Sequence, residues 1–410
     1  MMKVFPLIAL ERLGKVNPLC IDDYLNTGGF AALKKALELE PASILESIEK
    51  SGLRGRGGAG FPTGMKQRFT INSAKENVQR FVVCNADEGE PGTFKDRAIL
   101  ENDPFLLLEG MIISAIAIGA SKGYVYIRAE YYLSTERIEN AIAECYRLGF
   151  LGNSILGSNF SFHIDIALGA GSYLCGEELT LLESIEGKRG NPRIKPPFPA
   201  EKGLWGLPTL VNNVETFAHI PFIINNGPER YAQIGTEGSK GTKLFCVSGK
   251  VCKPGVYELP MGVTLRDLVF GVAGGMKESL EFKGALLGGA AGTFVDTSML
   301  DVPMAYETLK DKGATLGSGA VIVIDHQTNL KDLLASILDF FKHESCGKCV
   351  PCRVGTKLLL ERIKAPEFGA DDFDWMIEQS TYMVKNSLCP LGQSPDLPLK
   401  SFVRYFKNDI

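Results

Sequence analysis

The stretch Phe81-Val-Val-Cys-Asn-Ala-Asp-Glu-Gly-Glu-Pro-Gly92 joins a run of apolar residues to an acidic turn that contains glycine and proline. Such a run predicts a strand that is buried on both faces, because a half-exposed strand would alternate apolar and polar residues. Further strands are expected at 124–129 and 160–167, and they alternate with helices expected at 28–52, 104–120 and 134–148. This alternation predicts an α/β fold with a mainly parallel sheet.

Two glycine-rich loops, residues 53–64 and 169–176, are expected near the carboxyl ends of these strands, where α/β sheets bind ligands. Glycine lets backbone N–H groups approach a phosphate or a flat ring closely. In the first loop Gly55, Gly57 and Gly60 have the spacing of a dinucleotide fingerprint. This loop follows a helix instead of a strand, so a standard Rossmann site is not expected. Arg56 and Lys66 supply positive charge for a phosphate, and a merely flexible loop is the alternative interpretation.

Charged residues follow the predicted strands. Asp87, Glu88 and Glu90 are placed to accept hydrogen bonds from sugar hydroxyls, although a solvated turn is the simpler interpretation. Glu177 and Glu178 begin a helix, where carboxylates also stabilise the helix dipole. The segment 195–198, Lys-Pro-Pro-Phe, offers a cation and an aromatic face to a ligand, or it forms a rigid proline loop.

The pattern changes after residue 235. A hairpin over 243–249 and 255–259, a short helix over 265–273 and strands near 285–287 and 321–324 predict a small β-grasp domain. Helices expected at 330–343, 353–364, 371–385 and 395–406 predict a helical bundle. We therefore expect three domains, at 1–235, 236–328 and 329–410.

The composition excludes several classes of protein. The chain has 44 Lys and Arg against 48 Asp and Glu, a net charge of −4, which does not indicate binding to nucleic acid. The longest apolar run, 105–120, contains Glu109 and is shorter than the roughly 20 residues of a membrane-spanning helix. We expect no transmembrane segment and a cytoplasmic location, either free or on the cytoplasmic face of a membrane-associated complex.

Four of the ten cysteines are grouped. Cys346, Cys349 and Cys352 are spaced three residues apart, and Cys389-Pro390 follows at a distance. Three closely spaced thiolates and a remote fourth one are typical of a [4Fe–4S] cluster. Structural zinc usually takes cysteines in pairs, so zinc is a weaker alternative, and a site without metal is weaker still.

Five motifs together resemble one family. They are Gly-Arg-Gly-Gly-Ala-Gly-Phe-Pro-Thr-Gly (55–64), Cys-Asn-Ala-Asp-Glu-Gly-Glu-Pro-Gly-Thr-Phe-Lys-Asp-Arg (84–97), Gly-Ala-Gly-Ser-Tyr-Leu-Cys-Gly-Glu-Glu (169–178), Val-Asn-Asn-Val-Glu-Thr (211–216) and Glu-Ser-Cys-Gly-Lys-Cys-Val-Pro-Cys-Arg-x-Gly (344–355). The sequence resembles the flavoprotein NADH-binding subunit of respiratory complex I and its relatives in NAD-linked hydrogenases and formate dehydrogenases. The family has a Rossmann-like flavin- and NADH-binding domain, a ubiquitin-like β-grasp domain of the SLBB kind, and a helical cluster domain.

The resemblance implies a role for each matched residue. FMN would be held by Gly55, Arg56, Gly57, Lys66, Asn85, Asp87, Glu88, Gly176, Glu177, Asn212 and Asn213. NADH would be bound by Phe61, Phe69, Glu90, Tyr173, Glu178, Lys195 and Phe198. The [4Fe–4S] cluster would be ligated by Cys346, Cys349, Cys352 and Cys389.

The implied activity is electron transfer. NADH would give a hydride to FMN, which passes single electrons to the cluster, or the same steps would run in reverse and reduce NAD. No side chain is expected to act as a catalytic acid or base. Larger relatives carry further iron–sulfur domains that this sequence lacks, so the expected partners are a thioredoxin-like [2Fe–2S] subunit and another redox subunit, such as a hydrogenase or formate dehydrogenase. Glu90 and Glu178 would repel a 2′-phosphate, which favours NAD over NADP. A non-catalytic, metal-stabilised docking subunit and an electron-bifurcating assembly are the alternatives.

Overall fold

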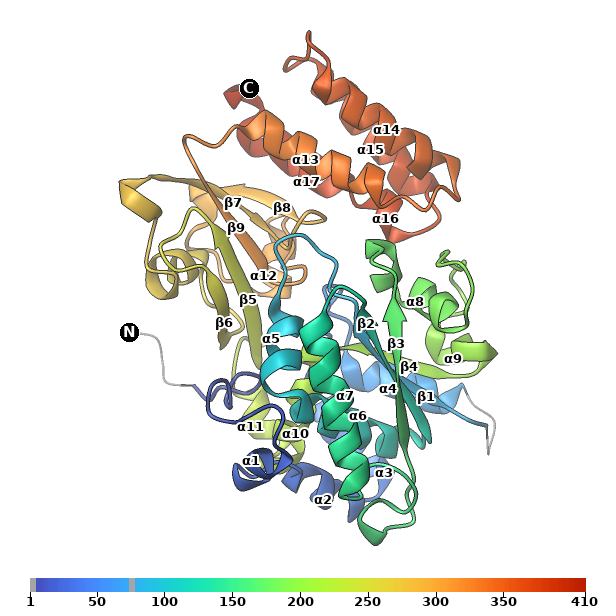
Figure 1. Cartoon of the computed structure of the whole chain (residues 1–410). Helices are drawn as coiled ribbons and strands as arrows, with labels where there is room; N and C mark the ends of the chain where they lie inside the picture. Colours follow the sequence, from blue (N-terminus) through green and yellow to red (C-terminus); the bar gives the residue numbers. More distant parts are fainter. Residues whose placement is uncertain (1–4, 74–77) are drawn as a thin grey trace.

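The computed structural model describes residues 5–73 and 78–410. Figure 1 shows three units, an α/β unit at the N-terminal side, a second unit built on a sheet, and a C-terminal helical unit. The strands of the first unit are β1 (Phe81–Ala86), β2 (Lys122–Arg128), β3 (His163–Gly169) and β4 (Thr209–Asn213). Its helices are α1 (Ile21–Asn26), α2 (Ala31–Leu37), α3 (Pro41–Ser51), α4 (Thr63–Asn72), α5 (Lys95–Asn102), α6 (Pro104–Ile118), α7 (Tyr132–Arg147), α8 (Glu178–Ile185), α9 (Pro199–Lys202), α10 (Val214–Asn226) and α11 (Pro228–Ala232).

The first sheet has the strand order β3-β2-β1-β4, and every pair in it is parallel. Both faces of β1 are buried. Val82 and Cys84 pack into the core that contains α6 and α10, whereas Phe81 and Val83 pack with the leucines of α8. The apolar run of β1 is continuous because both faces of the strand are buried, as the sequence predicted. The predicted α/β class is confirmed.

Helix α6 is buried along its whole length and lies in the core of the first unit. It contains Glu109, whose carboxylate accepts the hydroxyl of Tyr24 and the N–H groups of Phe30 and Leu33. Burial raises the pKa of Glu109, and these donors oppose the shift. No helix within residues 5–73 and 78–410 is both long enough and apolar enough to cross a membrane.

Two local predictions for the first unit differ from the structure. The helix expected over 28–52 is two helices, α2 and α3, because the chain turns before Pro41, which fits the first turn of a helix but not its interior. Strand β4 was not predicted, because it has only Leu210 and Val211 as apolar residues before the two asparagines.

The second unit is a five-stranded mixed sheet with the order β6-β5-β9-β7-β8. Its elements are β5 (Thr242–Gly249), β6 (Gly255–Pro260), β7 (Phe282–Leu287), β8 (Thr293–Asp296), α12 (Tyr306–Asp311) and β9 (Ala320–Asp325). The predicted hairpin is β5 and β6, which pair antiparallel. The helix expected over 265–273 is a π-helical segment over Asp267–Val272, and β8 was not predicted.

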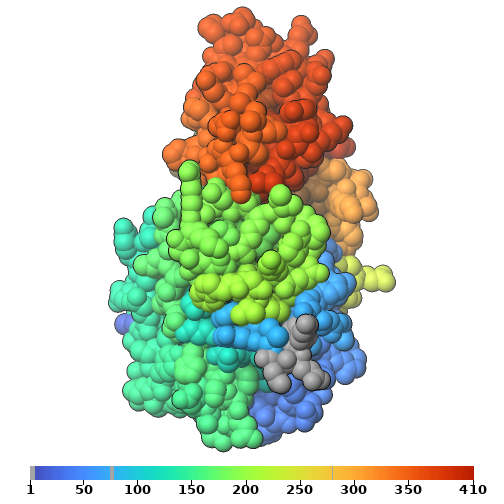
Figure 2. All heavy atoms as spheres, turned by 90° about the vertical axis from the view of Figure 1, so that its right-hand side faces the viewer, coloured from blue at the N-terminus to red at the C-terminus, as the bar shows by residue number. Residues whose placement is uncertain are grey.

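The third unit is helical, as predicted. Its helices are α13 (Leu330–His343), α14 (Val350–Lys364), α15 (Asp372–Asn386), α16 (Pro390–Gln393) and α17 (Asp396–Phe406). Phe402 of α17 meets Phe294 of β8 edge-on with ring centroids 5.2 Å apart, so this unit shares a core with the second sheet. Figure 2 shows it at one end of the molecule, above the green surface that includes α8.

The predicted domain boundaries fall between elements of the structure. The boundary after residue 235 lies between α11 and β5, and the boundary after residue 328 lies between β9 and α13. Side chains form contacts across both boundaries, so the three units are packed together. Their division into three separate domains stays a prediction.

Candidate functional site

The carboxyl end of β1 and the second glycine loop meet at one edge of the parallel sheet. The side-chain amide of Asn85 donates to the carbonyl of Gly176 over 2.7 Å, and its oxygen accepts the N–H of Asp87 at 3.2 Å. One carboxylate oxygen of Asp87 is buried with no partner among the described residues. Burial raises the pKa of Asp87 to about 7, although Arg128 opposes the shift. Three residues predicted to bind FMN therefore lie together.

Asn212 and Asn213 lie beside these residues, because β4 pairs with β1 in parallel. The side chain of Asn213 is engaged within the protein. Its oxygen accepts from Lys95 and from the N–H of Glu215, both at 3.1 Å, and its nitrogen donates to Asp96 at 2.5 Å. The side-chain nitrogen of Asn212 is buried without a partner in the described part of the chain. Asn212 therefore offers the free donor, while Asn213 belongs to a protein network.

The first glycine loop joins α3 to α4 and lies against the end of β4. The N–H of Gly55 donates to the carbonyl of Phe61 over 2.8 Å, which closes the loop on itself. A Cβ atom placed at Gly57 would lie 3.1 Å from the Cβ of Asn213, so a side chain at this position would crowd the asparagine. No acceptor within residues 5–73 and 78–410 takes the N–H of Gly57. The loop thus presents a free backbone donor next to the asparagine pair.

The side chain of Arg56, between Gly55 and Gly57, points into the protein. Its guanidinium donates to the hydroxyl of Tyr231 at 3.0 Å and to the carbonyl of Lys240 at 2.6 Å, and the whole residue is buried. Its N–H donates to the hydroxyl of Thr216 at 2.8 Å. A guanidinium that is held inside the protein cannot reach a phosphate on the outer side of the loop. We therefore propose that Arg56 anchors the loop from within and does not bind FMN through its side chain.

Glu88 and Glu177 both cap helices. The carboxylate of Glu88 accepts the N–H groups of Asp96 and Arg97 at 2.9 and 3.1 Å, in the first turn of α5. Glu177 is the N-cap of α8 and accepts two N–H groups of its first turn. The helix-stabilising interpretation that the sequence left open therefore describes Glu177, and it applies to Glu88 as well. These carboxylates fix the two loops that carry Asp87 and Gly176.

Lys66, Glu178 and Lys195 form a charged group near β4. Lys66 donates to the carbonyl of Val211 at 2.9 Å, and its ammonium nitrogen lies 3.7 Å from Glu178, while that of Lys195 lies 2.8 Å from Glu178. Burial lowers the pKa of Lys66. Burial acts to raise the pKa of Glu178, but the two lysines lower it overall. Glu178 is thus a carboxylate whose charge is offset by two cations.

Three phenylalanines from the predicted NADH pocket are exposed. The side chains of Phe61, Phe69 and Phe198 are 42%, 47% and 50% exposed. The ring centroids of Phe61 and Phe69 are 6.4 Å apart. Phe198 precedes α9, which packs against α4, the helix that carries Phe69. Exposed aromatic rings grouped in this way offer faces to a flat ligand.

All three units of the chain meet at the pair Tyr173 and Glu90. The hydroxyl of Tyr173 donates to Glu90 at 2.6 Å, and its N–H donates to the carboxylate of Glu344 at 2.9 Å. Its ring meets Phe340 of α13 edge-on with centroids 5.0 Å apart. Glu90 also accepts the N–H of Ala291, between β7 and β8, at 3.0 Å. Glu344 was not predicted as a site residue, although it begins the cysteine motif.

The four predicted cluster ligands come together. Cys352 and Cys389 are buried, Cys346 and Cys349 are half-buried, and all four pack in one group with Leu174. Burial, with a contribution from the neighbouring thiols, raises the pKa of Cys352 to about 11, so a thiolate at Cys352 requires a bound cation. Among the described residues, no three His, Cys, Asp or Glu side chains converge closely enough to hold a single ion. A cubane has one iron for each cysteine and needs no such convergence.

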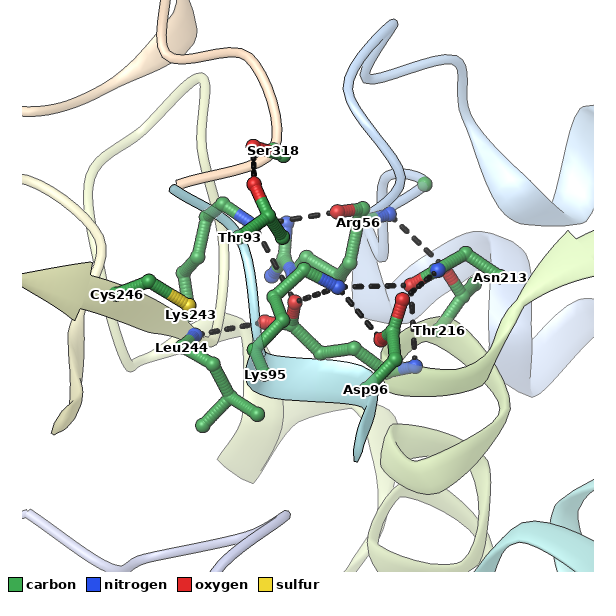
Figure 3. Close-up of polar contacts among 12 residues, drawn as sticks. Arg56, Thr93, Lys95, Asp96, Asn213, Thr216, Lys243, Leu244, Cys246 and Ser318 are labelled. Atoms are coloured by element: carbon green, nitrogen blue, oxygen red, sulfur yellow. Dashed lines mark hydrogen bonds and ion pairs between the residues drawn. The ribbon is translucent and has the colours of Figure 1, made fainter. Parts of the chain in front are cut away.

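A buried network of charges lies under the first glycine loop (Figure 3). The ammonium of Lys95 lies 2.7 Å from Asp96 and 2.9 Å from Glu215, and that of Lys243 lies 3.2 Å from Glu215. Although burial opposes the shift, the two lysines lower the pKa of Glu215 to about 2, whereas burial lowers the pKa of Lys243 to about 8. This network was not predicted from the sequence. Its only signal was that Lys95, Asp96 and Glu215 fall within the quoted motifs.

The residues at the sheet edge fit FMN by their chemistry. Asp87 offers a free acceptor, Asn212 and the N–H of Gly57 offer free donors, and Lys66 supplies positive charge. The unpaired atoms of Asp87 and Asn212 are buried, and a buried polar atom without a partner costs about 1–3 kcal/mol, whereas Gly57 is exposed. A ligand with hydroxyls, ring nitrogens and a phosphate would bond to all three groups. At the second site, four cysteines are the donor set of a [4Fe–4S] cluster.

The comparisons with known proteins agree with this chemistry. Residues 48–222 match the family model of the Nuo51 FMN-binding domain, residues 243–324 match the SLBB domain, and residues 332–410 match the NADH-ubiquinone oxidoreductase-F iron–sulfur binding region. The chain is 49% identical over 386 residues to the F subunit of the NADH-quinone oxidoreductase of Aquifex aeolicus, a match that covers 93% of this chain and 88% of that protein. The chain belongs to the family of NADH-quinone oxidoreductase F subunits. This match confirms the predicted resemblance and the predicted FMN and iron–sulfur cofactors.

Other members of this F-subunit family differ in name. The chain is 44% identical over 405 residues to the NADP-reducing hydrogenase subunit HndC of Solidesulfovibrio fructosivorans, covering 98% of this chain and 82% of that protein. Among solved structures, an NAD⁺-reducing [NiFe]-hydrogenase in its H₂-reduced state matches with a TM-score of 0.83 and 38% identity. That match covers 98% of this chain but 66% of the hydrogenase chain, which is therefore the longer one.

Proposed function

We propose that this chain oxidises NADH and passes the electrons through FMN to a [4Fe–4S] cluster and on to a partner subunit. The observation that carries the proposal is the course of the second glycine loop. Leu174 packs against Cys352 and Cys389, and two residues later Gly176 accepts the amide of Asn85 at the sheet edge. The candidate flavin site and the candidate cluster site are therefore joined by three residues of chain. Such an arrangement favours electron transfer between the two.

The FMN would be held by Gly55, Gly57, Lys66, Asn85, Asp87, Gly176 and Asn212, with Arg56, Glu88, Glu177 and Asn213 supporting them from within the protein. When bound, FMN supplies the chemistry that joins a two-electron donor to a one-electron acceptor. Asp87 accepts hydrogen bonds, Asn212 and the N–H of Gly57 donate them, and the ammonium of Lys66 attracts the phosphate. No side chain needs to remove a proton, so these residues bind and orient.

NADH would bind against the exposed phenylalanines, with Glu90, Tyr173, Glu178 and Lys195 as its polar contacts. The aromatic faces of Phe61 and Phe69 support stacking of a purine or nicotinamide ring. We propose NAD as the dinucleotide, although the charge of Glu178 is offset by Lys66 and Lys195 and therefore repels a 2′-phosphate less than the sequence alone indicated. Glu90, which is held by Tyr173 and Ala291, is the remaining acidic residue of the pocket.

The curated relatives are named as subunits, and a multi-subunit redox complex follows from membership of the family. We propose a thioredoxin-like [2Fe–2S] subunit and a further redox subunit as partners. We also propose that the assembly is located in the cytoplasm. An exposed apolar stripe supports a partner near the cluster. Val350, Val354 and Leu358 are spaced four residues apart on α14, directly after Cys349. Apolar residues exposed in a row indicate a surface that another protein covers.

The proposed function is tested with the purified chain, loaded with FMN and iron–sulfur cluster under anaerobic conditions. We expect the protein to reduce ferricyanide with NADH and to bleach its flavin absorbance on addition of NADH. A variant with serine at Cys389 should still bleach its flavin but should lack the reduced-cluster signal in electron paramagnetic resonance. A fully loaded protein that leaves NADH unoxidised would contradict the proposal.

A further inference from the structure

Two side chains of the second unit reach into the first glycine loop. The hydroxyl of Tyr306, at the start of α12, donates to the carbonyl of Gly55 at 2.9 Å. The ammonium of Lys243, on β5, donates to the carbonyl of Arg56 at 3.2 Å. Two consecutive carbonyls of the loop are therefore fixed by residues from outside the unit to which the loop belongs.

These contacts determine which way the neighbouring N–H groups point. In a trans peptide the C=O and N–H groups point in opposite directions. Because the carbonyl of Arg56 points to Lys243, the N–H of Gly57 points away from the buried network, toward the side of the loop that has no protein acceptor in the described chain. The carbonyl of Gly55 points to Tyr306, and the N–H of Arg56 is taken by Thr216 on the other side. Both peptide planes are thereby fixed.

Burial, an ion pair and close packing hold the side chain of Lys243 in this position. It is fully buried and makes an ion pair with Glu215. Figure 3 shows Lys243 near Arg56 and Lys95. A Cβ atom at Gly319 would lie 2.9 Å from its Cε atom, so a glycine there makes room for the lysine stem. Glu215 also holds the N–H of Leu244 at 2.7 Å, which attaches β5 to the start of α10. A buried ammonium is costly unless it is paired, so this lysine needs its partners.

The side chain of Tyr306 also packs closely against the first glycine loop. The guanidinium of Arg54 lies over its ring, 4.2 Å from the centroid. A Cβ atom at Gly60 would lie 2.6 Å from the ring, and Gly60 has a φ of +63°, which favours glycine. The ring therefore packs where the loop has no side chain, and its hydroxyl reaches the carbonyl of Gly55.

We propose that Lys243 and Tyr306 are positioning residues of the flavin site, which fix the peptide groups of the first glycine loop so that the N–H of Gly57 faces the bound FMN. The second unit is then part of the flavin cradle and not a separate module beside it. This inference rests on the proposed function, because it assigns the glycine loop to FMN.

The test compares Tyr306→Phe with Tyr257→Phe in the full-length, cluster-loaded chain. Tyr306→Phe removes one hydroxyl and keeps the ring against Gly60. Tyr257→Phe is the matched control, since the hydroxyl of Tyr257 donates to the carbonyl of Lys253 in the turn between β5 and β6. The dissociation constant of FMN is measured by flavin fluorescence, and the midpoint potential of the bound flavin by titration, both well below the melting temperature. We expect Tyr306→Phe to weaken FMN binding about fivefold, the effect of one lost hydrogen bond, and Tyr257→Phe to leave it unchanged.

Lys243→Met gives the second arm of the test. We expect it to weaken FMN binding at least as much as Tyr306→Phe and to shift the flavin potential to a more negative value, because a positive charge under the loop is lost. If Lys243→Met alone does not fold, the double variant with Glu215→Gln restores the charge balance and is tested in its place. We expect weak FMN binding from the double variant also, because the carbonyl of Arg56 still lacks its donor.

The outcomes separate this inference from the proposed function. A wild-type chain that binds no FMN would overturn the proposed function. If the wild-type chain binds FMN, and Tyr306→Phe and the folded Lys243 variant bind it as tightly and with the same potential, the positioning role is wrong. A purely structural role would lower the melting temperature of these variants and leave both flavin measurements unchanged.

Discussion

The N–H of Tyr173 donates to the carboxylate of Glu344 over 2.9 Å, which links the second glycine loop to a residue two positions before Cys346. The same tyrosine holds Glu90 through its hydroxyl. One residue therefore contacts both the predicted nucleotide pocket and the segment that begins the cluster motif. This contact gives the first prediction.

Glu344→Ala should raise the KM for NADH about threefold to tenfold with little change in FMN content, because the loop that carries Tyr173 loses a charge-assisted hydrogen bond. Glu344→Gln should behave nearly as the wild type, since the amide oxygen still accepts the N–H. Steady-state kinetics with ferricyanide as acceptor measure both variants. Equal KM values for the alanine variant and the wild type would refute this role of Glu344.

Cys389→Ser should lose the cluster and retain FMN, because the fourth iron loses its thiolate while the sheet edge is untouched. Iron and acid-labile sulfide per chain measure the loss. Cys252→Ser is the control, since Cys252 is exposed in the second unit and bonds to the carbonyl of Met276. Full iron content in Cys389→Ser would show that this cysteine is not a ligand.

Phe69→Leu should raise the KM for NADH several-fold without affecting FMN content or the melting temperature, because the ring is exposed and contributes little to the core. Phe270→Leu serves as its control, as this phenylalanine is similarly exposed but belongs to the second unit. If both variants keep the wild-type KM, Phe69 does not contact the nucleotide.

The pKa of Asp87, raised to about 7, predicts a pH dependence of the flavin-free chain. Between about pH 4 and pH 7 the unfolded state loses the Asp87 proton while the folded state retains it, so the free energy of unfolding falls as the pH rises through this range. Asp87→Asn removes this titration. The melting temperature of the variant should therefore exceed that of the wild type by a margin that grows from pH 5 to pH 7 and then levels. A margin that does not depend on pH would contradict the raised pKa.

The elements and sites that were predicted correctly are those set by residues close together in the sequence. The apolar run before Asn85 predicted a buried strand, and the spacing of Cys346, Cys349 and Cys352 predicted a cluster site, because each pattern lies within one short segment. The bounds of α13 were also predicted correctly from its apolar spacing.

Contacts between distant segments were not predictable in this way. Lys243 and Arg56 are 187 residues apart in the chain, and neither the charge of the lysine nor its position in a predicted strand indicates that it meets the glycine loop. The burial of Arg56 was missed for the same reason. Its guanidinium bonds to Tyr231 and Lys240, and both lie at the junction of two units that local patterns cannot bring together.

Electron flow from NADH through FMN to the cluster is tested by an anaerobic titration of the fully loaded chain with NADH, followed by absorbance and electron paramagnetic resonance. FMN takes two electrons and a [4Fe–4S] cluster takes one, so up to about three electrons should enter each chain, with flavin bleaching and a reduced-cluster signal appearing together. A chain whose flavin and cluster are both reduced by dithionite, but neither by NADH, would contradict the proposed function.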